Sequence, residues 1–167
     1  TAESTAPHLV FEYDASNRAL RARNAFNQGF GEQVAFLTGT LPVHGLTTDR
    51  AEFIGRDGGL GDPAALRRIG LSGELEPGTD PCAALQFHVD VAAGGEAEVC
   101  FVLGRAKDDE EADALLATWR SSERIEAAWQ ATNEFWDDVL GAVEVTSPER
   151  SLDLLLNRWL LYQALSC

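Results

Sequence analysis

The last twenty residues, 148–167, constrain the fold of this chain most, because they form an apolar helical pattern on nearly every side. Ser147 is placed to cap the helix, and Pro148 and Glu149 suit its first turn. The apolar positions are Leu152, Leu154, Leu155, Leu156, Trp159, Leu160, Leu161, Tyr162 and Leu165. A helix that is apolar nearly all round is usually buried on more than one side. We therefore expect this helix to pack against further parts of a larger protein, of which this chain is the front part.

The N-terminal part of the chain predicts antiparallel β-structure. Short apolar runs predict strands over residues 9–13, 18–23 and 33–38. The polar turn between the first two runs is typical of a β-hairpin. Residues 85–91 alternate apolar and polar side chains, and they return across a Gly-rich turn into residues 98–103. These two runs predict a second antiparallel hairpin.

Residues 39–81, between the predicted hairpins, are rich in Gly and Pro and show little periodicity. They contain one predicted short helix, residues 62–67, which Asp62 would cap. A segment of this length without regular structure is usually a binding loop or lid, or is disordered. Disorder is the less favoured alternative, because the segment carries several large apolar residues: Phe53, Ile54, Leu60, Leu66, Ile69 and Leu71.

The pattern changes to a helical period from Asp108 onward. Four consecutive acidic residues, 108–111, suit the N-terminus of a helix. They could also bind a cation, but their spacing matches no calcium loop. A second helix is predicted from Ser122 to the residue before Gly141. Strands followed by helices indicate the α+β class, and we place the boundary near Lys107.

Composition excludes several classes of function. The net charge of −14, from 27 acidic and 13 basic residues, argues against nucleic acid or an anionic membrane as a partner. No apolar run is long enough for a membrane span. Cys82, Cys100 and Cys167 are widely spaced and predict reduced thiols in a cytosolic protein. The three histidines are too scattered to predict a metal site.

The polar cluster of the long loop, Asp49, Arg50, Glu52, Arg56 and Asp57, has two interpretations. It could present carboxylates and guanidinium groups to sugar hydroxyls, or it could form internal salt bridges that order the loop. From spacing alone we favour the salt bridges. The four tryptophans could stack on sugars, but Trp119, Trp129, Trp136 and Trp159 all lie on predicted inner helix faces, so core packing is favoured.

Four segments, in order along the chain, resemble glycoside hydrolase family 94, the carbohydrate phosphorylases once grouped as glycosyltransferase family 36. Residues 49–57, DRAEFIGRD, are similar to a loop of the family's β-sandwich, and residues 71–86 resemble the lead-in to a late sandwich strand. Residues 135–145 are similar to the end of the family's linker helices. Residues 152–167 resemble the helix that opens its (α/α)6 barrel. Within the family the likeness is strongest to the phosphorylase-like region of cyclic β-1,2-glucan synthases.

The resemblance implies three domain segments. Residues 1–107 correspond to the C-terminal part of the β-sandwich domain, whose front strands have no counterpart here. Residues 108–146 correspond to the helical linker, and residues 147–167 to the first barrel helix, which is cut off. The implied fold class is thus α+β: an antiparallel β-sandwich segment followed by linker helices and the start of an (α/α)6 barrel.

The resemblance also implies a function for the parent protein. Family 94 enzymes cleave β-glucosides by inverting phosphorolysis, with inorganic phosphate as co-substrate and no metal. Their general acid and phosphate-binding residues belong to later barrel segments, so no catalytic residue and no metal ligand is assigned here. The family's sandwich loop approaches the sugar pocket and the subunit interface. The matching positions are Asp49, Arg50, Glu52, Phe53, Gly55 and Arg56.

The expected function is therefore that of a non-catalytic fragment of an enzyme acting on β-glucans. The implied partners are a β-glucan oligosaccharide, the rest of the barrel and a second subunit, and the implied location is the cytoplasm, on the cytoplasmic side of the inner membrane for a cyclic glucan synthase. Two alternatives remain: a self-standing glucan-binding β-sandwich, and a dimerisation scaffold.

Overall fold

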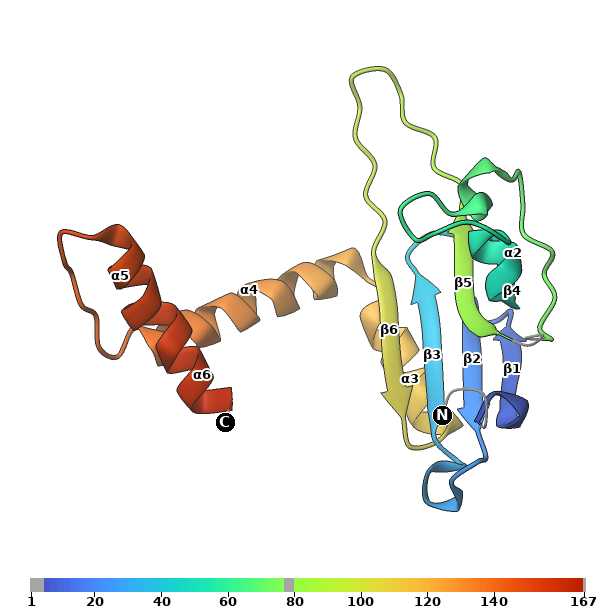
Figure 1. The fold of residues 1–167 in the computed structure, drawn as a ribbon, viewed down its shortest axis with the longest axis horizontal. Helices are drawn as coiled ribbons and strands as arrows, with labels where there is room; N and C mark the ends of the chain where they lie inside the picture. Colours follow the sequence, from blue (N-terminus) through green and yellow to red (C-terminus); the bar gives the residue numbers. More distant parts are fainter. Residues whose placement is uncertain (1–4, 77–79, 167) are drawn as a thin grey trace. The chain divides into compact units, whose positions relative to one another are not determined.

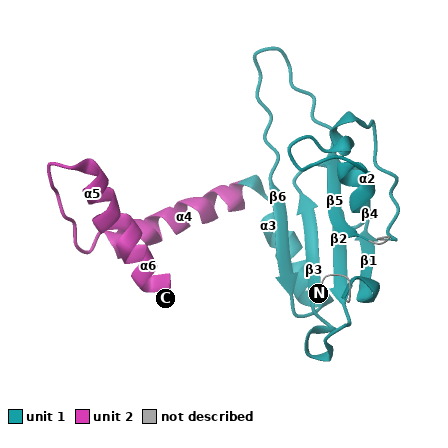
Figure 2. Ribbon diagram, viewed as in Figure 1, with its two compact units in different colours: residues 1–122 teal, residues 123–167 magenta. Residues whose placement is uncertain are grey.

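The computed structural model describes residues 5–76 and 80–166. These residues form two compact units, residues 1–122 and residues 123–167 (Figure 2). Compact units need not coincide with the domains of a protein family, so the domain boundaries at residues 107 and 146 stay predictions. The first unit contains antiparallel sheets and helices, which confirms the α+β class.

The main sheet of the first unit has four antiparallel strands (Figure 1). In spatial order they are β1 (Leu9–Asp14), β2 (Ala19–Asn24), β3 (Val34–Gly39) and β6 (Phe101–Ala106). The first two strands form the predicted hairpin, with Leu9 opposite Asn24. The third strand lies within one residue of its predicted bounds. Short 3₁₀ turns precede β1 (Ala6–His8) and β3 (Gln28–Phe30).

Helix α3 (Asp109–Trp119) covers one face of this sheet and forms the core with it. Asp108 caps the helix, because its carboxylate accepts a hydrogen bond from the Glu111 N–H at 2.9 Å. The acidic run is thus a helix N-terminus, as predicted. The core consists of Ala19, Val34, Phe36, Ala106, Ala112 and Leu116, with Val102 and Leu115 packed against it.

A buried arginine joins the same helix to the sheet. Arg21 of β2 is 5% exposed and pairs with three carboxylates: Asp14 of β1, and Asp109 and Asp113 of α3. A buried guanidinium requires such partners, because desolvation of an unpaired charge is very unfavourable. This ionic cluster joins α3 to β1 and β2.

A separate two-stranded sheet contains a strand that the sequence analysis missed. β4 (Val43–Asp49) pairs antiparallel with β5 (Pro81–Phe87), with Leu46 opposite Leu85. The region of β4 had been assigned to a segment of little regular structure. Its Thr47 and Thr48 are fully buried, so polar β-branched residues stand where an apolar strand pattern would be expected, and pairing with β5 holds the segment in extended form.

The predicted hairpin of residues 85–91 with 98–103 is wrong. The turn between them exists, since the Gly95 N–H donates to the Ala92 carbonyl at 2.9 Å. The strand before it ends at Phe87, however, and pairs with β4, whereas β6 pairs with β3. Residues 88–98 are irregular and exposed, including Val89 and Val91 of the alternating run. Each strand has its partner in another part of the chain.

Two short helices lie between β4 and β5. These are α2 (Arg50–Ile54) and a 3₁₀ helix (Ala64–Arg67). Asp62 does not cap the second of these: Pro63 holds the cap position without a side-chain hydrogen bond, and Asp62 instead pairs with Arg67.

The described part of the second unit, up to residue 166, consists of helices and their connecting segments. It contains α4 (Ser122–Leu140), which begins at the junction with the first unit, then α5 (Arg150–Leu154), a π-helical turn (Leu155–Trp159) and α6 (Leu160–Ser166). Gly141 follows α4 as predicted. Glu149, not Ser147, caps α5, because the Glu149 side chain accepts a hydrogen bond from the Ser151 N–H. Ser147 instead forms the preceding turn, where its hydroxyl oxygen accepts a hydrogen bond from the Glu149 N–H at 3.2 Å. Cys167, the predicted end of the helix, lies outside the described residues.

The burial predicted for the C-terminal helix is not found within this chain. No described residue of α5, the π-helical turn or α6 is buried. Trp159 is 58% exposed, and Trp129 of α4 is 64% exposed, so core packing is wrong for these two tryptophans. Trp119 and Trp136 are half-buried. Across residues 5–76 and 80–166, no helix combines the length and the hydropathy needed to cross a bilayer.

Candidate functional site

The six predicted site residues lie at the end of β4 and in α2. Asp49 caps α2, since its Oδ1 accepts a hydrogen bond from the Ala51 N–H at 2.8 Å. Gly55 ends the helix with φ +91° and ψ 159°, and its N–H donates to the Ala51 carbonyl at 3.0 Å. This backbone conformation is essentially restricted to glycine. Both residues therefore have a structural role in shaping this turn.

Glu52 faces the segment that follows the 3₁₀ helix. Its carboxylate accepts hydrogen bonds from the Ser72 hydroxyl at 2.7 Å and the Ser72 N–H at 2.8 Å, and it pairs with Arg68 at 3.1 Å. Burial raises the pKa of Glu52, but hydrogen bonds from Thr47 and Ser72 and the charge of Arg68 outweigh it, so the pKa is lowered. Glu52 is ionised and fully engaged, which matches the salt-bridge interpretation for this residue.

Phe53 lines a different hollow from Arg50 and Arg56. It lines an apolar pocket of about 320 Å³ with Leu71, Leu85 and Phe87. Two of these partners belong to β5. Phe53 therefore packs α2 onto the two-stranded sheet.

The remaining predicted residues, Arg50, Gly55 and Arg56, come together in one hollow of about 300 Å³. We call it the arginine pocket; it is lined by Arg50, Ala51, Ile54, Gly55, Arg56, Gly58 and Asp80. Arg50 is held on one side, because its Nε lies 3.5 Å from Asp80 Oδ2 and its N–H donates to the Asp80 carbonyl at 3.1 Å. Sequence reasoning missed Asp80 and Gly58, and no local spacing signals that Asp80 meets Arg50 across β4 and β5.

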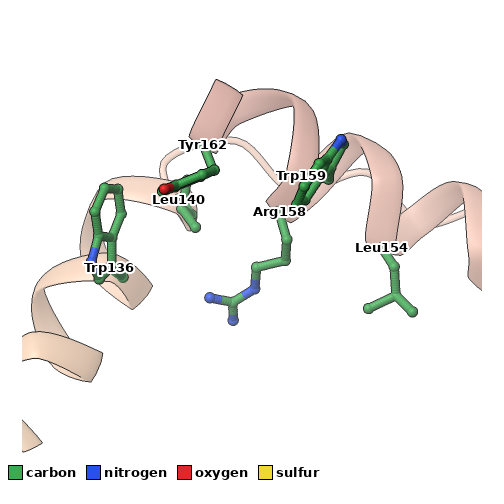
Figure 3. A pocket seen from close by; sticks show the side chains of 6 residues that line it. All are labelled: Trp136, Leu140, Leu154, Arg158, Trp159 and Tyr162. Carbon is green, nitrogen blue, oxygen red and sulfur yellow. The ribbon is translucent and has the colours of Figure 1, made fainter. Parts of the chain in front are cut away.

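The second unit contains a larger pocket, which we call the aromatic pocket (Figure 3). It has a volume of about 520 Å³ and is lined by Trp136, Leu140, Leu154, Arg158, Trp159 and Tyr162. The rings of Trp136 and Tyr162 meet edge to face at 5.6 Å, and Arg158 pairs with Asp137 at 2.6 Å. A sugar needs several hydrogen-bonding groups around such rings, and this pocket offers few. Its chemistry suits apolar side chains better than a saccharide.

Two further features bear on chemistry in the first unit. His44 of β4 stacks on His88 with ring centroids 4.3 Å apart, and its Nε2 lies 2.7 Å from the Ile69 carbonyl oxygen. Burial and the neighbouring Asp49 carboxylate raise the pKa of Cys82 to about 11, so its thiol is protonated and unreactive. In the described part of the chain, no group of three or more His, Cys, Asp or Glu residues is arranged to hold a metal ion.

The sequence of this chain matches a protein-family model and several known proteins. The model of the glycosyl hydrolase 94 supersandwich domain matches residues 1–122. The chain is 37% identical over 164 residues to the cyclic beta-(1,2)-glucan synthase NdvB of Rhizobium meliloti (strain 1021), covering 98% of this chain and 6% of that protein. It is 26% identical over 132 residues to an N,N'-diacetylchitobiose phosphorylase of Vibrio furnissii, covering 79% of this chain and 16% of that protein. A cellobionic acid phosphorylase of Neurospora crassa is 26% identical over 140 residues, with 84% and 18% covered. The chain thus spans less than a fifth of each of these relatives.

Proposed function

Since the chain belongs to glycoside hydrolase family 94, whose supersandwich domain it carries, we propose that it is the non-catalytic sandwich and linker segment of an enzyme acting on β-glucans. The observation that carries the proposal is the 37% identity to a cyclic beta-(1,2)-glucan synthase over 98% of the chain. The parent enzyme would be of the cyclic β-1,2-glucan synthase type, and its reaction the inverting phosphorolysis of β-glucosides. Inorganic phosphate would be the co-substrate, and no metal would be required.

The C-terminal helices would be the start of an (α/α)6 barrel. The similarity to NdvB extends beyond residue 122, where the supersandwich match ends, so residues 123–167 continue the same relationship. Exposed apolar side chains on α5 and α6, and the aromatic pocket beside them, would be covered by later barrel helices. Burial of one large apolar side chain contributes roughly 1.5–3 kcal/mol, which makes such a covering strongly favourable.

The arginine pocket would lie close to the donor sugar of the parent enzyme. Arg50 and Arg56 line this hollow, and their guanidinium groups can donate several hydrogen bonds to hydroxyl oxygens. The natural partners would be a β-glucan oligosaccharide, the rest of the barrel and a second subunit. The location would be cytoplasmic, on the cytoplasmic side of the inner membrane.

Kinetics of the parent enzyme test this placement. Arg50→Ala and Arg56→Ala should each lower kcat/KM for the glucan at least tenfold, whereas Arg67→Ala, an exposed arginine outside the pocket, should leave it unchanged. Unchanged kinetics in both pocket variants would remove the assignment.

The scaffold alternative is favoured by one observation, the exposed apolar surface of α5 and α6. Sedimentation over a range of concentrations distinguishes it. Self-association of the parent enzyme that Trp159→Ala and Leu165→Ala abolish, with glucan turnover intact, would favour a dimerisation scaffold.

A further inference from the structure

We infer that the arginine pocket is a binding site for an oxyanion, a carboxylate or phosphate group, and that Arg50 and Arg56 grip it together. The inference concerns the same hollow as the proposed function and rests on it for its place in the parent enzyme. Anion binding itself would be a property of this chain, so it is tested on this chain directly.

The first argument is the number of unused donors. An arginine side chain carries five N–H donors and no acceptor. Arg50 Nε lies 3.5 Å from Asp80 Oδ2, and within residues 5–76 and 80–166 the Arg50 side chain forms no hydrogen bond. Arg56 forms no ion pair or side-chain hydrogen bond with any described residue. Two guanidinium groups with free donors therefore line a single hollow.

The second argument is local charge. Two positive groups and one negative group, Asp80, line the pocket, so its formal charge is +1 (2 − 1). The whole chain carries −14. An anion is repelled by most of this surface, so binding at this hollow needs specific contacts and not general attraction. Bidentate, charge-assisted hydrogen bonds from arginine to a carboxylate or phosphate are the strongest contacts of this kind.

The third argument is room and backbone access. Gly55 and Gly58 form part of the wall without side chains, so backbone lines this side of the hollow. The volume of about 300 Å³ corresponds to roughly ten water molecules at about 30 Å³ each. An anionic group fits with space around it, either as free phosphate or carried on a sugar ring.

Nuclear magnetic resonance titration of the 167-residue chain tests the inference. The probes are sodium phosphate and sodium glucuronate, with glucose as the neutral control and sodium chloride at matched ionic strength. We expect saturable shifts of the Gly55 and Gly58 amide signals and of the Arg50 and Arg56 Nε signals with an anion. Arg56→Gln should weaken the affinity for the anion at least tenfold. Arg50→Lys should weaken it severalfold, because lysine keeps the positive charge but lacks the paired N–H donors of a guanidinium group. Arg67→Gln, the matched control, should bind like the wild type.

Each outcome decides the inference. Absence of saturable shifts with both anions, equal response to glucose, or unchanged affinity in Arg56→Gln would overturn it. Tighter binding of glucuronate identifies a sugar-borne carboxylate, and tighter binding of phosphate identifies the free anion. If the Arg56→Gln variant does not fold, Arg56→Lys replaces it. Unchanged anion affinity in both Arg56→Lys and Arg50→Lys would then also contradict the inference. Anion binding with unaltered kinetics of the parent enzyme would remove only the proposed function, and altered kinetics without anion binding would remove only this inference.

Discussion

Helix α3 and the C-terminal helices α5 and α6 are all apolar on one side or more, yet they lie in opposite environments. Ala112 and Leu116 of α3 are fully buried against the four-stranded sheet. In contrast, every described residue from Arg150 to Ser166 is at least partly exposed. The apolar pattern of a helix indicates how much of its surface has to be buried. Which element buries that surface depends on the order and pairing of the elements in the fold. In the first unit the four-stranded sheet supplies that cover for α3.

The largest expected effect comes from the buried side of this comparison. Leu116→Ala should lower the free energy of unfolding by about 3 kcal/mol, because it removes buried methyl groups and leaves a cavity beside Phe36. Leu154→Ala, at an exposed position of α5, should change it by less than about 0.5 kcal/mol. Urea denaturation of both variants makes the measurement. Equal losses would show that α5 is packed in solution.

The next effect contrasts a buried ion cluster with a surface pair. Arg21→Gln should lower the free energy of unfolding by about 2 kcal/mol, because Asp14, Asp109 and Asp113 lose their shared partner. Arg158→Gln breaks the exposed pair with Asp137 and should lower it by less than about 1 kcal/mol. The same denaturation experiment compares the two. A larger loss for Arg158→Gln would reverse the contrast between the units.

A backbone effect of about 1 to 2 kcal/mol is expected at Gly55. Gly55→Ala should destabilise the first unit, because alanine disfavours φ +91° and its Cβ would lie 3.1 Å from the Ala64 Cβ. Gly59→Ala, in the same loop but in open space, is the control and should have little effect. Thermal unfolding followed by circular dichroism is suitable. An unaffected Gly55→Ala variant would mean that the turn after α2 is free to rearrange.

The smallest effect concerns acid sensitivity. For Glu52 and Asp14 burial raises the pKa, but hydrogen bonds and neighbouring arginines outweigh it, so both pKa values are lowered in the folded state. Their contribution to stability is therefore complete above the unfolded pKa, near about 4, and is lost as pH falls through the folded values. Glu52→Gln should cost about 1 kcal/mol at pH 7 and flatten the loss of stability below about pH 4.

Denaturation midpoints between about pH 2 and pH 7 measure this dependence. The exposed Glu149 of the second unit offers the matched control, Glu149→Gln, which should alter the acid profile less. A profile that Glu52→Gln leaves unchanged would contradict the role given to this carboxylate.

Local sequence signals predicted the elements whose partners are close along the chain. The β1–β2 hairpin follows from two apolar runs and a polar turn, and α3 follows from its acidic first turn and period. β4 was missed because Gly45 interrupts it and two of its buried residues are threonines. The pairing of β5 and β6 was predicted wrongly because a turn lies between them, while their true partners lie elsewhere in the chain.

The same limit applies to the candidate site. The resemblance of residues 49–57 to a family loop named the residues, but it did not divide them among environments. Glu52 is engaged by Arg68 and Ser72, and Phe53 by β5, which leaves Arg50 and Arg56 for the arginine pocket. These divisions depend on contacts with residues 16 to 34 positions away, which no local spacing encodes.

The position of β6 beside β3 has a consequence for the order of folding. Strands β1, β2 and β3 are consecutive in the sequence and can pair through short connections. The second edge of β3 pairs only with β6, where Leu37 lies opposite Leu103. Closing so long a loop is entropically costly and slow compared with hairpin formation. We expect β6 and α3 to join last, after the β4–β5 ribbon, which lies between β3 and β6 in the sequence, has formed.

During synthesis, Val34 and Phe36 therefore stay open to water until residues 101–119 have left the ribosome. An uncovered strand edge and apolar face of this kind is the usual starting point for misassembly between neighbouring nascent chains. The pairing of β6 covers the edge of β3, and α3 completes the core, so the two together end that hazard.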